Sequence, residues 1–284
     1  MAHLVTDIYM PVLPAILPLL IANNGYSYLA AGLLVTAYNL TSSFTQPVIG
    51  WLSDTKGFTI DISVSLFISA IFVALMGITQ NYILLILFAV LAALGHALFH
   101  PAALSLVSRL CTSENRGRIT SYFVVGGNFG YAIGPVIAGG LVWWLGLSGL
   151  LLLIIPAIIM VFGLRHLLPG GIAGASAGHP APVHFSGKAP SKKPFIILMV
   201  ASILRAWAVF AAITFLPMYL VTQGYTLVTA TMIVTLMLLS GVGGQVVGGH
   251  RSLTASGEKS SWSVRWSAQF RRSTYSLRAP DLSR

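Results

Sequence analysis

Charged side chains are missing from four long blocks of this sequence, and their absence limits what the chain can fold into. No Asp, Glu, Lys or Arg occurs in residues 8–53, 62–108, 119–164 or 206–250, and each block is 45 to 47 residues long. About 20 apolar residues cross the roughly 30 Å hydrocarbon core of a bilayer. Each block therefore has room for two membrane spans and a tight turn. With 8% charged and 56% hydrophobic residues overall, the composition excludes a soluble enzyme and a disordered chain.

Turn-forming residues lie near the middle of each block, so we expect four helical hairpins. Helices are favoured over barrel strands because the apolar runs are continuous and do not alternate in segments of about ten residues. The sequence thus predicts an all-α transmembrane protein with eight spans. They are 4–22, 28–52, 61–79, 82–108, 119–145, 148–168, 195–222 and 227–249.

Basic residues predict the orientation of these spans. The turns inside the hairpins hold no Lys or Arg, whereas the links between hairpins hold Lys56, Arg109, Arg116, Arg118, Arg165, Lys188, Lys192 and Lys193. Basic residues in short loops favour the cytoplasmic side. We therefore expect a multi-pass protein of the inner (plasma) membrane with a cytoplasmic N-terminus. No basic stretch precedes the first apolar run, so a cleaved signal peptide is not expected.

The segment 169–194 is rich in Gly, Pro, Ala and Ser and predicts a cytoplasmic linker. It separates an N-terminal six-span bundle, 1–168, from two further spans, 195–250. Six spans, a long linker and more spans are typical of transporters built from two six-span halves. The expected partners are a small-molecule substrate, protons and the lipid bilayer. Nucleic acid is not expected despite the net charge of +10, because seven of the 16 basic residues lie in 251–284.

The link after the second span carries a short motif. Gly50, Leu52, Ser53, Asp54 and Gly57 match the pattern G-x-L-(S/A)-D-x-x-G-(R/K) at five positions. This pattern follows the second span in the major facilitator superfamily, which the chain resembles. We expect the first glycine to permit close helix approach, and the aspartate to cap the next helix or pair with a basic group. The alternative is an ordinary polar turn.

A second motif lies in the fifth predicted span. Gly130 and Gly134 form G-x-x-x-G, which brings helices close together, and Pro135 is expected to bend the helix. With Asn128, and with Gly139–Gly140 one position late, the stretch resembles the antiporter motif G-x-x-x-G-P-x-x-G-G of drug/proton exchangers. The alternative is helix packing alone.

The chain further resembles the fosmidomycin-resistance branch of the superfamily, in residues 2–7, 46–50, 99–101, 125–130 and 134–135. This resemblance implies a helical bundle of twelve spans, of which about eight are present. It also implies proton-coupled efflux of a small drug-like compound, without a cofactor. A metabolite uptake porter of the same superfamily and a non-functional transporter remnant are the alternatives.

Two ionisable residues stand in the first predicted span. Asp7 is its only carboxylate, and His3 lies four residues earlier on the same helical face. An ionisable group inside a membrane is costly and therefore a functional candidate. The pair could hold and release a proton during transport, or Asp7 could simply cap the helix.

His96 and His100 share a face of the fourth predicted span. We expect them to line a polar cavity or pack against a neighbouring helix, with proton relay and metal binding as alternatives. No third ligand or nucleophile–base pair is evident nearby, so neither a metal site nor an intramembrane enzyme is expected. Arg205, in the seventh span, could bind an anionic substrate in a cavity or extend to the cytosolic edge.

The composition changes abruptly after residue 250. Residues 251–284 hold nine Ser and seven basic residues, which predicts a basic tail outside the membrane. When the codons from Ser252 onward are read in a shifted reading frame, they can encode a second copy of the superfamily signature. We therefore expect that a frameshift near codon 250 produced this tail, and sequencing the gene tests it: a stop within a few shifted codons would refute the idea.

Overall fold

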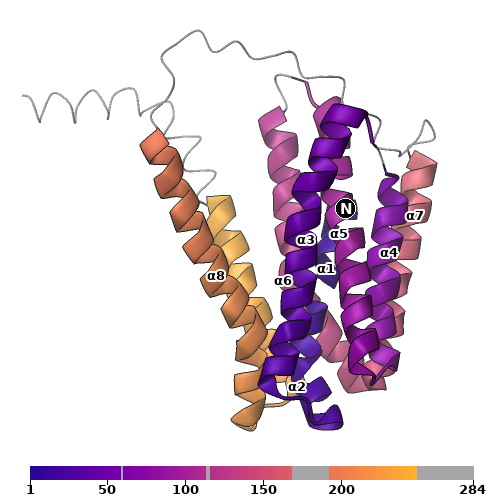
Figure 1. The fold of residues 1–284 in the computed structure, drawn as a ribbon, viewed down its shortest axis with the longest axis vertical. Coiled ribbons are helices and arrows are strands. Elements are labelled where there is room, and N and C mark those ends of the chain that lie inside the picture. Colours follow the sequence, from indigo (N-terminus) through magenta and orange to yellow (C-terminus); the bar gives the residue numbers. More distant parts are fainter. Residues whose placement is uncertain (59, 113–115, 168–191, 248–284) are drawn as a thin grey trace, which may run out of the picture. The chain divides into compact units, whose positions relative to one another are not determined.

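The computed structural model describes residues 1–58, 60–112, 116–167 and 192–247. The chain divides into two compact units, Met1–Leu239 and Ser240–Arg284, and all contacts below lie in the first. The described elements are α1 (Ala2–Tyr9), α2 (Val12–Asn24), α3 (Tyr28–Lys56), α4 (Ile62–Leu75), the 3-10 helix η1 (Met76–Ile78), α5 (Tyr82–Leu110), α6 (Arg116–Leu145), the 3-10 helix η2 (Leu147–Leu153), α7 (Ile154–Leu167) and α8 (Lys192–Thr222), shown in Figure 1. A further helix spans Leu227–Val247.

Each of the eight predicted spans coincides with a helical segment, which confirms the all-α prediction. Among the described residues, six helices are long and apolar enough to cross a membrane: Ala2–Asn24, Tyr82–Ser108, Arg118–Leu145, Leu147–His166, Phe195–Thr222 and Leu227–Val247. Ile62–Ile78 is a shorter apolar helix. The helix α3 has 29 residues, but its Thr, Ser, Asn and Gln residues lower its mean hydropathy.

The first predicted span is two helices, because α1 ends at Tyr9 and α2 begins at Val12. Proline explains the break. Pro11 and Pro14 have no backbone N–H, so the carbonyls four residues before each of them lose their helical donors. The chain therefore changes from α1 to α2 at Met10–Pro11, just after the segment that carries Asp7.

The ends of the helices follow local chemistry. Gly57 ends α3 with a positive φ of 65°, and its N–H donates to the carbonyl of Leu52. Asp61 caps α4, because its carboxylate accepts a 2.6 Å hydrogen bond from the N–H of Ser63. The expectation that Asp54 caps this helix is therefore wrong. Asp54 lies inside α3, seven residues before the position from which a side chain can reach the first N–H groups of α4.

The core of the first unit forms around α1 and α2. Tyr9, Ile16, Leu17 and Leu20 are fully buried there, and the hydroxyl of Tyr9 donates a 2.9 Å hydrogen bond to the carbonyl of Leu153. Around this centre α3, α5 and α4 run side by side (Figure 1). A pair of N-terminal helices enclosed in this way can hold polar side chains away from lipid.

Three of the predicted mid-hairpin turns meet at one end of the helices. The hydroxyl of Tyr26 donates to the carbonyl of Gln80, and the ring of Tyr82 packs edge-on against Tyr26. A Cβ placed on Gly77 would meet the backbone of Leu147. The turns without basic residues are therefore neighbours, as an arrangement of membrane hairpins requires.

Cysteine labelling tests which side of the membrane this end faces. Single cysteines at Asn24, Gln80 and Gln223 are expected to react with a membrane-impermeant maleimide on intact cells, because the basic links favour the opposite, cytoplasmic side. The native Cys111 serves as the internal control, reacting only after permeabilisation. Labelling of Cys111 in intact cells, with the three turn positions silent, would reverse the orientation.

Two predicted segments fall largely outside the described residues. Of the linker 169–194, only residues 192–194 are described, and they begin α8. Residues 251–284, which the frameshift prediction concerns, are not described.

Candidate functional site

Four predicted residues meet in one buried cluster. His3 and Asp7 lie one turn apart on α1, and His96 and His100 lie one turn apart on α5. His3 Nε2 is 3.1 Å from Asp7 Oδ2, and His100 Nε2 is 3.8 Å from Asp7 Oδ1. His96 Nε2 and His100 Nε2 are 3.0 Å apart. His3 and His100, which are 97 positions apart in the sequence, therefore both lie beside one carboxylate. We call His3, Asp7, His96 and His100 the His–Asp cluster.

Glycines of α6 allow α1 to approach closely enough to close this cluster. A Cβ on Gly127 would lie 2.6 Å from Asp7 Oδ2 and still closer to the ring of His3. A Cβ on Gly130 would overlap the backbone of Leu4, and one on Gly134 would lie 2.6 Å from the carbonyl oxygen of Ile8. The predicted close approach at Gly130 and Gly134 is thus present in the fold, and its partner is α1.

The hydrogen bonds of His3 define which of its nitrogens carries a hydrogen. His3 Nδ1 lies 2.7 Å from the carbonyl oxygen of Phe123 on α6. Because a carbonyl oxygen can only accept, Nδ1 must donate. In a neutral imidazole the other nitrogen, Nε2, then has only a lone pair. That lone pair faces the carboxylate of Asp7, so a cation or an extra hydrogen is needed between the two groups.

The cluster is sheltered and incompletely paired. The side chains of His3 and Asp7 are 12% and 13% exposed, and His96 is 3% exposed. Asp7 Oδ1 and His96 Nδ1 are buried and have no hydrogen-bond partner among the described residues. A buried polar atom without a partner is costly, so the cluster favours a bound hydrogen or cation.

Aromatic rings surround the cluster, and sequence reasoning missed their role. His3 stacks on Phe123 with ring centroids 4.0 Å apart, and on Phe99 at 6.0 Å. Tyr38 of α3 lies 6.3 Å from His96, ring to ring. The only local signal for Phe99 is its position between the two histidines of α5, while Phe123 contributes a backbone carbonyl that no motif marks.

The structure contradicts one alternative for Asp7. The N-cap position of α1 is Met1, whose side chain makes no capping hydrogen bond. Asp7 lies near the other end of this helix. The helix-cap interpretation of Asp7 is therefore wrong, and its side chain turns instead toward α5 and α6.

Arg205 does not join the cluster. It lies within α8, and its side chain is exposed in the described part of the chain. Because α8 begins at Lys192, three residues earlier than the span predicted at 195, Arg205 lies thirteen residues into the helix.

The motif after the second span is helical rather than a loop. Gly50, Leu52, Ser53 and Asp54 lie in the last turns of α3, and Gly57 ends that helix. A Cβ on Gly50 would meet nothing within 4 Å, so the close approach expected there is not found among the described residues. Ser53 lines a small cavity with Pro101 and Ser105 of α5.

The fifth-span motif lies in the middle of α6. Pro135 is inside the helix, and the next N–H, that of Val136, donates a 3.2 Å hydrogen bond to the hydroxyl of Thr235. A Cβ on Gly139 would overlap the side chain of Thr231. The motif therefore has two packing faces, one toward α1 and one toward the helix Leu227–Val247. Asn128 lies between the glycines Gly127 and Gly130 that touch α1.

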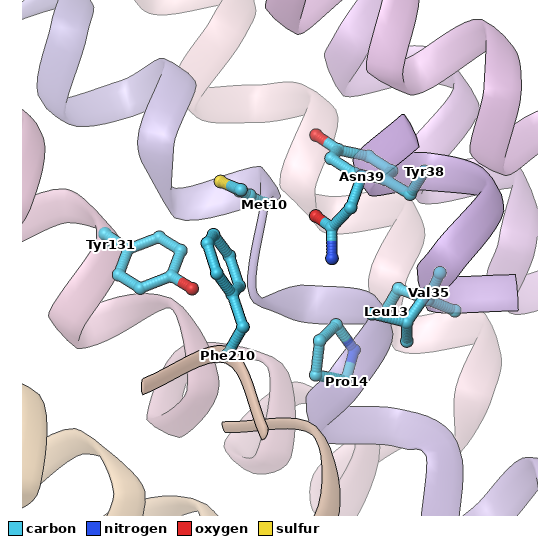
Figure 2. Close-up of a pocket in the computed structure, with 8 residues that line it drawn as sticks. All are labelled: Met10, Leu13, Pro14, Val35, Tyr38, Asn39, Tyr131 and Phe210. Carbon is cyan, nitrogen blue, oxygen red and sulfur yellow. The ribbon is translucent and has the colours of Figure 1, made fainter. Parts of the chain in front are cut away.

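A cavity and a cleft with shared lining residues lie near the cluster in the described part of the chain. A small one of about 10 Å³, drawn in Figure 2, is lined by Met10, Leu13, Pro14, Val35, Tyr38, Asn39, Tyr131 and Phe210. A larger cleft of about 530 Å³ lies between α3 and α8. Val35, Asn39 and Phe210 line both, so the small cavity stands between the large cleft and Tyr38, which neighbours His96.

A sequence model of the Major Facilitator Superfamily matches residues 1–269. The chain belongs to the Major Facilitator Superfamily. This membership confirms the family resemblance found in the two motifs, and it makes the protein a multi-span membrane protein of a transporter family.

Individual relatives are distant. The chain is 28% identical over 191 residues to the fosmidomycin resistance protein of Escherichia coli (strain K12), covering 64% of this chain and 47% of that protein. It is 28% identical over 165 residues to the MFS-type transporter YfnC of Bacillus subtilis (strain 168), covering 58% of this chain and 40% of that protein. The chain thus spans less than half the length of these relatives.

The fold is also that of a solved transporter. The crystal structure of a bacterial homologue of the human lysosomal transporter Spinster, in an inward-facing and occupied conformation, superimposes with a TM-score of 0.71 at 18% identity. The match covers 88% of this chain and 58% of that one. At this identity the likeness concerns the fold alone.

Proposed function

We propose that this chain acts as a proton-coupled secondary transporter of the Major Facilitator Superfamily that exports a small drug-like compound. The observation that carries this proposal is the 3.1 Å approach of His3 Nε2 to Asp7 Oδ2. These two atoms are both hydrogen-bond acceptors when His3 is neutral and Asp7 ionised. A proton held between them makes this approach favourable, because one of the two atoms then donates to the other.

The surroundings of the pair suit a proton that binds and leaves. His3 is held by the carbonyl of Phe123, so it can take up a hydrogen on Nε2 without losing its orientation. On the other side of Asp7, the facing nitrogens of His100 and His96 form a short chain along α5. A hydrogen on one of these nitrogens can pass to the other, which suits a relay between the carboxylate and the interior of the fold.

The cleft between α3 and α8 suits the substrate. Its lining is mostly apolar and aromatic, and Thr36, Asn39 and Thr214 are its polar residues without an aromatic ring. The other lining residues are Tyr28, Leu29, Gly32, Leu33, Val35, Trp207, Phe210, Ala211 and Phe215. Ligand sites of this kind bind compounds with a large apolar surface and a few hydrogen-bonding groups. No charged side chain is among these residues, so a cleft-bound compound would be recognised by shape and hydrogen bonds.

Two relatives support export rather than metabolite uptake, while a third, 24% identical over 130 residues, is the probable L-galactonate transporter of Escherichia coli (strain K12). The fosmidomycin resistance protein of Escherichia coli and a multidrug transporter, MdtP of Bacillus subtilis, which is 35% identical over 111 residues, are named for resistance or drug transport. The motif in α6 resembles that of drug/proton exchangers, which supports the same direction.

Reconstitution tests the proposal. The full chain is placed in liposomes that hold a pH-sensitive dye, and fosmidomycin or another small drug is added on one side. Proton-coupled exchange predicts a change in internal pH that depends on the added compound and is absent from protein-free liposomes. Compound-dependent flux without proton movement would identify an uncoupled porter. Absence of both would indicate a non-functional remnant.

A further inference from the structure

The ligand atoms of His3, Asp7 and His100 all lie within 4.8 Å of one another. They come from two helices, α1 and α5, and their side chains are only 12%, 13% and 21% exposed. Sequence spacing alone pairs His96 with His100 and leaves a metal without a third ligand. The fold supplies that ligand, since the carboxylate of Asp7 lies beside His100 and the imidazole of His3 lies beside Asp7.

The hydrogen bonds prepare His3 for metal binding. His3 Nδ1 donates to the carbonyl of Phe123 at 2.7 Å, which leaves the lone pair of Nε2 directed at Asp7. A histidine that binds a metal usually donates its other ring N–H to a carbonyl or carboxylate, which fixes the ring and the tautomer. The contact between His3 and Phe123 is of this kind.

The spacing of the atoms also fits a metal. Two ligands bound to one tetrahedral zinc ion, with bonds of about 2.0–2.1 Å, are about 3.3 Å apart. The pair formed by His3 Nε2 and Asp7 Oδ2 is separated by 3.1 Å, and that of His100 Nε2 and Asp7 Oδ1 by 3.8 Å. Asp7 Oδ1, which has no hydrogen-bond partner among the described residues, is free to become a ligand. His96 Nε2, 3.0 Å from His100 Nε2, is the neighbour nearest to a fourth position.

We propose that His3, Asp7 and His100 form a binding site for a divalent transition-metal ion of the zinc and cobalt type. Two imidazole nitrogens and a carboxylate suit such borderline ions better than Mg²⁺ or Ca²⁺, which prefer oxygen ligands. The site joins α1 to α5, and through Phe123 it is also tied to α6. A bound ion therefore holds these three helices together.

The consequence for transport rests on the proposed function. The ion occupies the space between His3 and Asp7 that the proposal assigns to the coupling proton.

Metal binding is measured on the full chain in detergent, prepared without a histidine tag. Co²⁺ is the probe, because its visible absorption reports nitrogen and oxygen ligands, and Zn²⁺ is then used to displace it. We expect one equivalent of Co²⁺ to bind to the unmodified protein. Loss of a group that only orients a ligand costs about 10- to 100-fold in metal affinity. His3→Gln and His100→Gln each remove one ligand of three, so each should weaken Co²⁺ binding by at least about 100-fold.

His166→Gln is the matched control, because His166 is an exposed histidine at the end of α7 and its loss should leave binding unchanged. Far-ultraviolet circular dichroism of each variant shows whether it has folded. Absence of Co²⁺ binding to the folded unmodified protein would overturn the proposal. The proposal would also be overturned if the folded His3→Gln and His100→Gln variants bound Co²⁺ as tightly as the unmodified protein. Co²⁺ binding is measured without transport. The proposal of a metal site and the proposal of proton-coupled transport can therefore be refuted separately.

Discussion

Asp7→Asn is expected to abolish proton-driven export while leaving substrate binding measurable. The asparagine keeps the size of the side chain, and its amide N–H can donate to the lone pair of His3 Nε2. The packing of α1 against α6 is therefore preserved. A carboxamide does not titrate in the physiological range, so the coupling proton that we propose between His3 and Asp7, whose facing atoms are 3.1 Å apart, has no place to bind. In proteoliposomes with this variant, the change in pyranine fluorescence on addition of substrate should be no larger than in protein-free vesicles.

The matched control for this change is Asp61→Asn. Asp61 caps α4 through the N–H of Ser63, and asparagine caps a helix about as well as aspartate. Export should persist in this variant. Substrate binding, measured by tryptophan fluorescence, should be similar in both variants, because the cleft between α3 and α8 does not include either residue. Undiminished proton-coupled export by Asp7→Asn would reduce Asp7 to a structural contact between α1 and α5.

The hairpins of this fold could be predicted from the sequence because the bilayer imposes a simple rule. A span must be apolar for about 20 residues, and most of the charged residues before position 251 lie in or next to the links, with Asp7 and Arg205 as exceptions inside spans. The break between α1 and α2 was not predicted, although Pro11 and Pro14 signal it, because a continuous apolar run conceals where the helical hydrogen bonds are lost. The helical end of α3 was also missed, since the motif there contains polar residues that suggest a loop.

The His–Asp cluster could be predicted only in halves. The spacing of His3 and Asp7, and of His96 and His100, places each pair on one face of a helix. Nothing in either spacing says that the two faces meet, because that depends on how α1 packs between α5 and α6. The carbonyl of Phe123 carries no side-chain signal at all, yet its hydrogen bond decides which nitrogen of His3 faces Asp7.

Arg205 and Asp54 show the limit of reasoning from depth or motif position. The depth of Arg205 along its helix predicts a cavity or the cytosolic edge, but depth does not say which side of the helix the residue occupies. Its side chain is exposed among the described residues, and both interpretations stay predictions. For Asp54 the capping expectation required the motif to lie outside a helix. Once α3 extends to Lys56, the capping position belongs to Asp61.

Gly130→Ala is expected to disrupt the fold and the cluster together. The added Cβ would overlap the backbone of Leu4 on α1, and backbone atoms cannot turn away as a flexible side chain can. Overpacking costs roughly 1–3 kcal/mol in well-packed cores, and a backbone contact lies at the upper end of this range. Relief requires α1 to move away from α6.

That movement would separate groups that lie on different helices. The hydrogen bond from His3 to Phe123 joins α1 to α6 and measures 2.7 Å, so a shift of about 1 Å takes it beyond the range of a normal hydrogen bond. The pair His3–Asp7 lies within α1 and would move as one body. Gly130→Ala should therefore lower the unfolding temperature in detergent. It should also break the hydrogen bond that keeps the hydrogen of His3 on Nδ1. Gly126→Ala is the control, since a Cβ on Gly126 meets nothing within 4 Å and alanine favours a helix over glycine by about 1 kcal/mol. Equal unfolding temperatures for the two variants would contradict the close approach of α1 and α6, and with it the contact from Phe123 that orients His3.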